Sequence, residues 1–458
     1  MKLTLVGGGG VRSPLFVMSL LNWQARIGVT ELCLMDIDPR KLEIFGALCR
    51  EIIRRAGDPF QLTLTTDPRR ALTGAAHVVT TIRVGQDRGR AVDERIALRH
   101  GVLGQETTGP GGFAMALRSI PALLEYANLL QEVSPGAWMY NFTNPAGLVA
   151  QALRDAGFER TIGICDGANS GQGALAAWLG VDPHRVRAEV FGLNHLSWCR
   201  RAWVDGVEHM QPALQEDEFL RRMQPLFAPQ LVRQVGAYCN EYLYYYYYAE
   251  QAVAAINAEG QTRGEEIVEL NARLLDQLEE IGVERNPERA LRAFFGYEKR
   301  RGATYMHYAY GGQTIAEANR QPVFDAEIPA QAGEGYAGVA LSVIDALVNG
   351  GPLYTALNVP NRGAIQGLAE DDMVEVSSRV DAGGVQALPV GEISAAQLNL
   401  ARTVKLYERL TAAAIQQHSR ELAVQALMVH PLVLSYPRAC ALVEEYLAAH
   451  REFVGEWR

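Results

Sequence analysis

The sequence lacks the features that would place this chain in a membrane, outside the cell or on nucleic acid. No apolar run approaches the ~20 residues that a membrane-spanning helix needs. The six cysteines show no disulfide-framework spacing, which in a chain of 458 residues favours a reducing cytoplasm. The first residues follow a strand pattern rather than that of a signal peptide. A net charge of −9 disfavours nucleic acid. We expect a cytoplasmic protein without membrane or nucleic-acid partners.

The composition is that of a globular protein, with 48% hydrophobic and 21% charged residues. Up to residue 165, short apolar runs alternate with helical patterns. The expected strands cover 2–6, 31–38, 61–65, 77–83, 137–142 and 161–165, and the expected helices begin at Ser13 and cover 40–55 and 114–132. This alternation predicts an α/β fold with a Rossmann-like, doubly wound parallel sheet.

The alternation ends near residue 200. Helical patterns then dominate 212–283, 334–348 and 396–455, and 349–394 resembles loops and short strands. We predict a first domain over residues 1–195. A mixed α+β domain over 196–458 would close over the carboxyl edge of the sheet, bind substrate and form a homodimer or homotetramer.

A glycine-rich loop follows the first expected strand. Gly7, Gly8, Gly9 and Gly10 would let the backbone approach a pyrophosphate at the start of the next helix, which begins at Ser13. Asp36 ends the second expected strand, where a carboxylate usually accepts from ribose hydroxyls and favours NAD over NADP. The loop therefore predicts an NAD-binding domain, and the alternative is a tight strand–helix turn without a ligand.

Further motifs resemble one family along nearly the whole chain. The segments are VGGGGVRSP, LMDID, IRVGQDRGRAVDE, GQETTGPGG (104–112), NFTNPAG (141–147), ICD, GLNHLSW, EYLYYY and KRRGATY. They resemble the family 4 glycoside hydrolases, the NAD- and metal-dependent 6-phospho-glycosidases. The resemblance implies that NAD oxidises carbon 3 of the sugar, which acidifies the proton on carbon 2. A base then removes that proton, the glycosidic oxygen leaves, and water adds as the steps reverse.

The resemblance also implies a metal site made by Cys165 and His195. A thiolate and one imidazole leave coordination positions open, as a catalytic metal needs. The ligand types alone would suit zinc or a softer ion, so manganese rests on the resemblance. Taken as isolated residues, the two could instead be a core thiol and a buried histidine.

Two residues are implied as the acid and the base. Asp166 follows Cys165 and would protonate the leaving oxygen, or else order the metal or the strand end. Asp at this position is typical of members acting on α-glycosides, whereas GQETTGPGGF is typical of β-acting members, so the anomer stays open. Tyr242, in EYLYYY, would be the base, which requires a nearby cation to lower a pKa near ~10. We expect most of the run 244–248 to pack or to form an oligomer interface.

The remaining predicted contacts concern cofactor and sugar. Arg83 is assigned to the cofactor, and Arg90 and Arg300 to an anion such as a 6-phosphate, which suits the planar guanidinium. Asn144 and Asn194 would bond sugar hydroxyls or the nicotinamide. Any one of these arginines could also be a solvated charge.

The chain departs from the family pattern on the substrate side. The segment after Cys165 lacks a proline and has Gly167, Arg12 follows the glycine loop, and Arg301 and Met306 replace smaller residues. These changes leave open an unphosphorylated substrate, or one with a uronate or sulfonate. A plain NAD-dependent hydroxy-acid dehydrogenase and a non-catalytic NAD-binding sensor are the rival functions.

Overall fold

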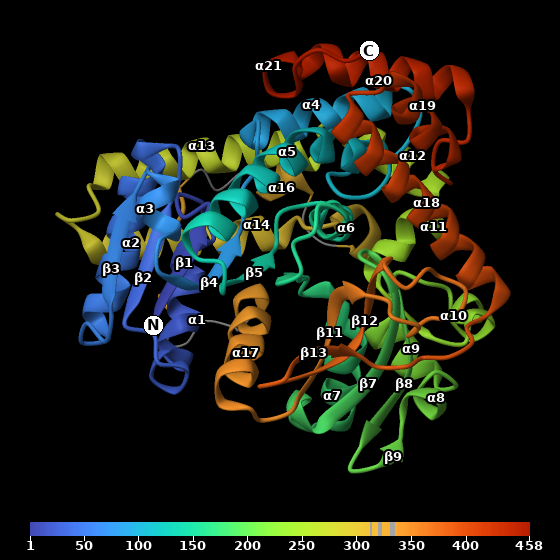
Figure 1. Cartoon of the computed structure of the whole chain (residues 1–458), viewed down its shortest axis with the longest axis horizontal. Helices are drawn as coiled ribbons and strands as arrows, with labels where there is room; N and C mark the ends of the chain where they lie inside the picture. Colours follow the sequence, from blue (N-terminus) through green and yellow to red (C-terminus); the bar gives the residue numbers. More distant parts are fainter. Residues whose placement is uncertain (312–313, 319–322, 330–334) are drawn as a thin grey trace.

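The computed structural model describes residues 1–311, 314–318, 323–329 and 335–458. Its main element is a nine-stranded sheet in the order β13-β12-β11-β6-β5-β4-β1-β2-β3 (Figure 1). The strands are β1 Lys2–Val6, β2 Glu31–Met35, β3 Gln61–Thr65, β4 Ala75–Thr80, β5 Trp138–Asn141, β6 Thr161–Gly163, β11 Leu353–Pro360, β12 Met373–Asp381 and β13 Gly384–Ala387. β1 to β6 are parallel, and β11 to β13 extend the sheet antiparallel.

The order of the six parallel strands is that of dinucleotide-binding sheets, with a switch between β1 and β4. The helices between them are α1 Ser13–Ile27, α2 Pro39–Arg55, α3 Pro68–Leu72, α4 Gln86–Arg99, α5 Pro110–Val133 and α6 Ala146–Asp155. Right-handed crossovers place α1 and α2 on one face and α3, α5 and α6 on the other. The packing follows this division, since α1 contacts α2 whereas α5 contacts α3 and α6.

The predicted fold class is therefore confirmed. The strands expected at 2–6 and 61–65 are found with those bounds, whereas those expected at 31–38 and 77–83 end three residues earlier, at Met35 and Thr80. The continuous burial of β1, β2 and β4 explains why their apolar runs were recognisable. The helix α4 had no counterpart in the sequence-based prediction.

A second, smaller sheet follows the parallel strands. It contains β7 Val186–Leu193, β8 Leu196–Val204, β9 Val207–Glu208 and β10 Tyr238–Cys239. β7 and β8 form a hairpin whose turn is Asn194–His195. A boundary at residue 195 would thus cut this hairpin, and β11 to β13 from the second part complete the first sheet. The two parts are joined more closely than the division at 195 implied.

Helices cover the rest of the molecule. They are α7 Ser170–Leu179, α8 Met210–Ala213, α9 Asp217–Met223, α10 Pro229–Val235, α11 Tyr244–Tyr247, α12 Ala249–Glu259, α13 Arg263–Ile281, α14 Pro287–Ala303, α15 His307–Tyr310, α16 Ile315–Ala318, α17 Gly335–Asn349, α18 Ala395–Gln417, α19 Arg420–Val429, α20 Tyr436–Ala449 and α21 Arg451–Val454. The carboxyl-terminal helices lie beside α4 and α5 (Figure 1). Among the described residues, no helix has the length and apolar character to cross a membrane.

Candidate active site

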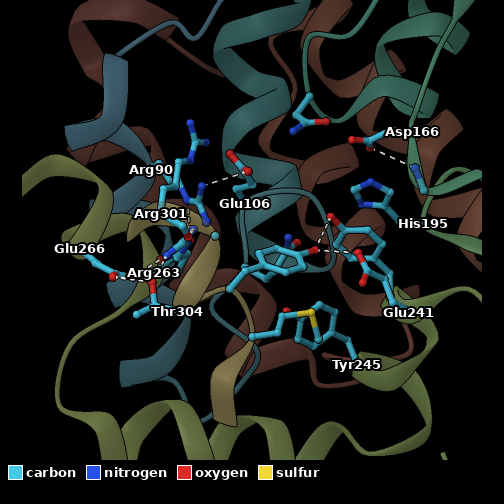
Figure 2. Close-up of a pocket in the computed structure, with 18 of the residues that line it drawn as sticks. Arg90, Glu106, Asp166, His195, Glu241, Tyr245, Arg263, Glu266, Arg301 and Thr304 are labelled. Carbon is cyan, nitrogen blue, oxygen red and sulfur yellow. Dashed lines mark hydrogen bonds and ion pairs between the residues drawn. The ribbon is translucent and has the colours of Figure 1, made fainter. Parts of the chain in front are cut away.

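A cavity of about 640 Å³ lies beyond the carboxyl ends of β4, β5 and β6. This is the edge at which open α/β sheets bind their ligands. The opposite wall comes from the 3₁₀ turn Glu241–Leu243 and from residues between Gln261 and Ile315. Figure 2 shows Asp166 and His195 at one end of the cavity. At the other end, which we call the arginine end, lie Glu266 and the arginines Arg90, Arg263 and Arg301.

The glycine loop is built for a close approach of backbone to backbone. Gly7 has φ = 98°, and a Cβ on it would lie 2.8 Å from the carbonyl carbon of Thr81. A Cβ on Gly8 would lie 2.7 Å from the Cβ of Leu34. Side chains are therefore excluded from the inner side of this loop. The loop adjoins the cavity wall, because Thr81, which meets Gly7, and Arg12, which follows the loop, both line the cavity.

The loop and Asp36 are held together. The Gly9 N–H donates to Asp36 Oδ2 at 2.9 Å, and the Asp38 N–H donates to Asp36 Oδ1 at 3.0 Å. Helix α1 begins directly after the loop with buried Ser13, and its N-cap residue, Arg12, makes no side-chain capping bond. The N–H groups of the four glycines donate within the protein. The amino end of α1, whose dipole favours an anion, lies directly after the loop.

Four predicted residues from three segments converge on the cavity, and we call them the catalytic cluster: Cys165, Asp166, His195 and Tyr242. Cys165 and Asp166 follow β6. His195 is in the β7–β8 turn with φ = 61°, a left-handed conformation that costs a non-glycine residue free energy. Its Nδ1 atom is buried and has no hydrogen-bond partner among the described residues. Unusual backbone and an unsatisfied ring nitrogen together indicate a functional rather than a packing role.

Burial sets the protonation of the two candidate ligands. It lowers the pKa of His195 to about 4, with Asp166 and Glu106 acting in the opposite direction, so the ring is neutral as a metal ligand must be. Burial raises the pKa of Cys165 well above its ordinary value, and the charges of Glu375 and Asp166 add to this effect. The thiol therefore needs a cation beside it to ionise.

Tyr242 packs flat on His195, with ring centroids 3.6 Å apart and an interplanar angle of 3°. Its hydroxyl lies 3.1 Å from that of Tyr305, which in turn donates to Glu241 at 2.7 Å. Burial, followed by Glu241 and Cys165, raises the pKa of Tyr242 well above its ordinary value. Because the pKa is raised, Tyr242 would need a neighbouring cation to lose its proton and act as a base, as expected from the sequence.

The tyrosine run divides as the helical geometry requires. Of residues 244–248, Tyr245 lines the cavity and hydrogen-bonds the hydroxyl of Tyr308 at 2.9 Å. Tyr247 accepts from the indole of Trp198, and Tyr248 accepts from the backbone N–H of Ala228. Tyr247 and Tyr248 therefore make contacts within the chain, and an oligomer interface at this run stays a prediction.

Arg83 and Arg90 share a carboxylate that the sequence did not single out. Glu106 accepts from Arg83 at 2.6 Å and from Arg90 at 3.0 Å, and Arg90 also donates to Glu94 at 2.7 Å. Burial alone would raise the pKa of Glu106, but Arg83, Arg90 and Arg301 outweigh it and lower the pKa to about 2. Glu106, Arg83 and Arg90 all line the cavity. Both arginines therefore lie at the predicted site, where the carboxylate of Glu106 partly neutralises their charge.

Arg300 is placed differently from the prediction. It is buried and donates to Glu266 at 2.9 Å and to Thr304 at 3.2 Å, and it is not among the residues that line the cavity. Arg301 lines the cavity instead. On helix α14 adjacent residues face in different directions, so the KRRG segment alone could not decide between them.

The two asparagines also separate. Asn144 lines the cavity after β5, whereas Asn194 is not among the lining residues and donates to Glu375 at 3.0 Å. Glu375 belongs to β12, which had no place in the sequence-based site. The four departures from the family pattern, by contrast, all line the cavity: Arg12, Gly167, Arg301 and Met306.

The sheet order is that of an α/β fold of the dinucleotide-binding class, and its cavity is lined by a cysteine and a histidine. A family model described as "Family 4 glycosyl hydrolase" matches residues 2–181, and one described as "Family 4 glycosyl hydrolase C-terminal domain" matches residues 190–433. The chain belongs to the family 4 glycosyl hydrolases. The predicted family and the predicted glycosidase class are confirmed.

Several relatives match over their full length. A probable 6-phospho-beta-glucosidase of Bacillus subtilis is 30% identical over 471 residues, covering 100% of this chain and 98% of that protein. A phospho-alpha-glucosidase of Clostridium acetobutylicum is 27% identical, covering 99% of each. A solved structure of the 6-phospho-beta-glucosidase of Thermotoga maritima with manganese, NAD⁺ and glucose-6-phosphate is 28% identical, with a TM-score of 0.82 and 99% coverage of both chains.

Proposed function

We propose that this enzyme hydrolyses 6-phospho-glycosides in the described cavity with the help of NAD and a divalent metal, manganese above all. The observation that carries this proposal is the convergence of the catalytic cluster on one cavity beside the glycine loop. The Thermotoga maritima relative supports it, since its structure contains manganese, NAD⁺ and glucose-6-phosphate together.

The residues at the loop fit NAD. Gly7 and Gly8 leave no room for a side chain on the inner side of the loop, which keeps its backbone where a pyrophosphate would lie. Asp36 is held at the end of β2, where it would accept from the ribose hydroxyls. Neither feature involves a residue of the catalytic cluster, so both support the cofactor independently of that cluster.

The residues at the other end fit a metal. Cys165 would supply a soft thiolate once a cation lies beside it, and His195 supplies a neutral imidazole whose Nδ1 atom has no hydrogen-bond partner among the described residues. Among the described residues there is no group of three or more such ligands. Two protein ligands leave positions for sugar oxygens, as a catalytic site requires.

When bound, NAD supplies reversible oxidation at a sugar carbon, and the metal supplies Lewis acidity toward the oxygens beside it. Tyr242 then removes the proton from carbon 2, with its ring fixed by His195 and its hydroxyl by Tyr305. Asp166 gives a proton to the leaving glycosidic oxygen, because it lies on the exposed side of the cluster and lines the cavity. Asn144 is placed to bond a sugar hydroxyl or the nicotinamide.

The arginine end of the cavity would receive the phosphate. We assign this role to Arg90 and Arg301, since both line the cavity and Arg300 does not. We keep Arg83, which shares Glu106 with Arg90, as a contact of the cofactor. A second candidate, with a neutral, uronate or sulfonate sugar, is favoured by the position of all four family departures in the cavity wall.

The test is a screen of nitrophenyl α- and β-glycosides, each with and without a 6-phosphate, in the presence of NAD, Mn²⁺ and a reductant. We expect the phosphorylated form of one anomer to exceed its neutral counterpart by on the order of 10²-fold in kcat/KM. Full activity after removal of metal and nucleotide would refute the proposed chemistry. Net NADH release on adding a hydroxy acid would instead support the dehydrogenase.

We also propose that the enzyme works in the cytoplasm as a homodimer or homotetramer. All six cysteines are free, which suits a reducing compartment. Light scattering coupled to size-exclusion chromatography would measure the assembly directly.

A further inference from the structure

A buried carboxylate lies directly behind the catalytic cluster. Glu375 of β12 is 0% exposed and accepts hydrogen bonds from three side chains. The donors are Ser197 Oγ at 2.7 Å, Asn194 Nδ2 at 3.0 Å and Asn358 Nδ2 at 3.2 Å. Burying a carboxylate is costly unless such donors satisfy it, so a residue of this kind needs a reason to be charged and polar.

Two of these donors flank His195 in the chain. Asn194 occupies the β7–β8 turn with His195, and Ser197 follows at the start of β8. Glu375 therefore holds the turn on both sides of the candidate metal ligand. The left-handed backbone of His195 is the kind of conformation that persists only when its surroundings fix it.

The network has little room to move. A Cβ on Gly147 would lie 2.8 Å from the Cβ of Asn194, and a Cβ on Gly163 would lie 2.7 Å from the Cβ of Asn358. Both donors thus pack directly against glycine backbone, which limits their motion. The His195 ring is in turn restrained on one face by Tyr242.

We propose that Glu375 is a positioning residue that fixes the Asn194–His195 turn, so that His195 and Cys165 keep the geometry needed to bind the divalent metal. This inference rests on the proposed function, because it assigns Glu375 a role toward that metal. Residues that orient metal ligands typically change metal affinity by ~10–100-fold when they are replaced. Glu375→Gln keeps the side-chain volume but turns an amide donor toward side chains that are themselves donors.

The experiment measures Mn²⁺ affinity rather than turnover. Purified wild-type and Glu375→Gln proteins, saturated with NAD, are titrated with Mn²⁺ and followed by electron paramagnetic resonance of the unbound ion. We expect the Kd for Mn²⁺ to rise ~10–100-fold in Glu375→Gln, with the Kd for NAD unchanged. The melting temperature of the metal-free protein is measured in parallel to separate affinity from stability.

A matched control comes from the same strand. Ser377 also lies on β12, and its hydrogen bonds go to the β7 backbone at Ala188 and Val190 rather than to the turn. Ser377→Ala should therefore leave the Kd for Mn²⁺ at the wild-type value. Ser197→Ala removes one donor while two remain, and it replaces Glu375→Gln as the test if that variant does not fold. It should raise the Kd in the same direction by a smaller factor.

The outcomes separate the two proposals. Unchanged Mn²⁺ affinity in Glu375→Gln, or in Ser197→Ala as its replacement, would overturn the positioning role. An equal loss of affinity in Ser377→Ala would overturn it as well, since it would indicate a general disturbance of the sheet. Cys165→Ala, which leaves no ligand atom at this position, tests the metal site itself. If that variant binds Mn²⁺ as tightly as the wild type, the proposed metal site fails and the role of Glu375 fails with it.

Discussion

The cofactor loop and the catalytic cluster are built in opposite ways. The loop, Ser13 and Asp36 lie within the first 36 residues, and neighbouring strands confine the loop backbone. The cluster is made of side chains from the segment after β6, the β7–β8 turn and the segment after β10, and Glu375 of β12 hydrogen-bonds the turn at Asn194. A site made of local backbone needs only a short stretch of sequence, whereas a site made of side chains depends on the whole fold.

The largest effect should come from the cluster and leave the loop untouched. We expect Tyr242→Phe to lower kcat by ~10²–10⁴-fold, because it removes the proposed base but keeps the ring that packs on His195. Turnover in deuterated water should place deuterium at carbon 2 of the wild-type product, and the variant should show no such exchange. The Kd for NAD should not change.

Persistent exchange in Tyr242→Phe would show that the base is another residue, and Tyr245 and Tyr305 would be the next candidates because both line the cavity. A wild-type product without deuterium would exclude elimination altogether. An ordinary two-carboxylate glycosidase does not break the bond between carbon 2 and its hydrogen, so it would place no deuterium there.

Asp166→Asn should have a large effect on selected substrates only. If Asp166 protonates the leaving oxygen, glycosides with poor leaving groups should slow by ~10²–10⁴-fold while nitrophenyl glycosides react at nearly the wild-type rate. Asp166 Oδ1 also accepts from the Gly167 N–H at 3.0 Å. Equal losses on both substrate types would therefore assign Asp166 to the geometry of the strand end.

The loop can be tested by adding one methyl group. Gly8→Ala would place a Cβ 2.7 Å from the Cβ of Leu34 and 2.9 Å from the backbone N of Met35, so the backbone must shift. We expect the Kd for NAD to rise on the order of 10²-fold and the melting temperature to fall. Gly10→Ala, whose Cβ would lie 3.1 Å from the Gly7 carbonyl oxygen, should lower the melting temperature less. Unchanged NAD affinity in Gly8→Ala would contradict the assignment of the glycine loop to NAD binding.

The same contrast explains what the sequence could and could not predict. The glycine loop, Asp36 and the parallel strands were recognisable because each depends on a short pattern. Glu106 was not, although it lies in the GQETTGPGG segment, because its partners Arg83 and Arg90 precede it by 23 and 16 residues. Glu375 could not be predicted from the sequence for the same reason, because only the folded chain brings β12 to Asn194.

Neighbouring arginines on α14 offer a matched pair for the next test. Arg301→Met should raise the KM for a phosphorylated substrate ~10–100-fold with little change in melting temperature, because Arg301 lines the cavity. Arg300→Met should instead cost about 3 kcal/mol of stability, since it removes a partner of the buried Glu266. Denaturant unfolding measures the stability of both variants, and steady-state kinetics measure their KM for the phosphorylated substrate. A stability loss confined to Arg301→Met would reverse the assignment.

The smallest effect concerns the charge of Glu106 and its pH dependence. Its pKa is lowered to about 2, so the native state is stabilised by the carboxylate above the ordinary carboxyl pKa of 4.5. That contribution is lost as the pH falls from about 4.5 toward about 2, because the carboxylate then takes up a proton in the native state too. Its side chain is 15% exposed, and we expect a contribution of about 2 kcal/mol to the free energy of unfolding at neutral pH.

Glu106→Gln should therefore be less stable than the wild type at pH 7, and the gap in unfolding free energy between the two proteins should narrow between about pH 4.5 and about pH 2. Unfolding curves of both proteins across this range measure the gap. A gap that stays constant would show that shape, not charge, accounts for the role of Glu106 between Arg83 and Arg90.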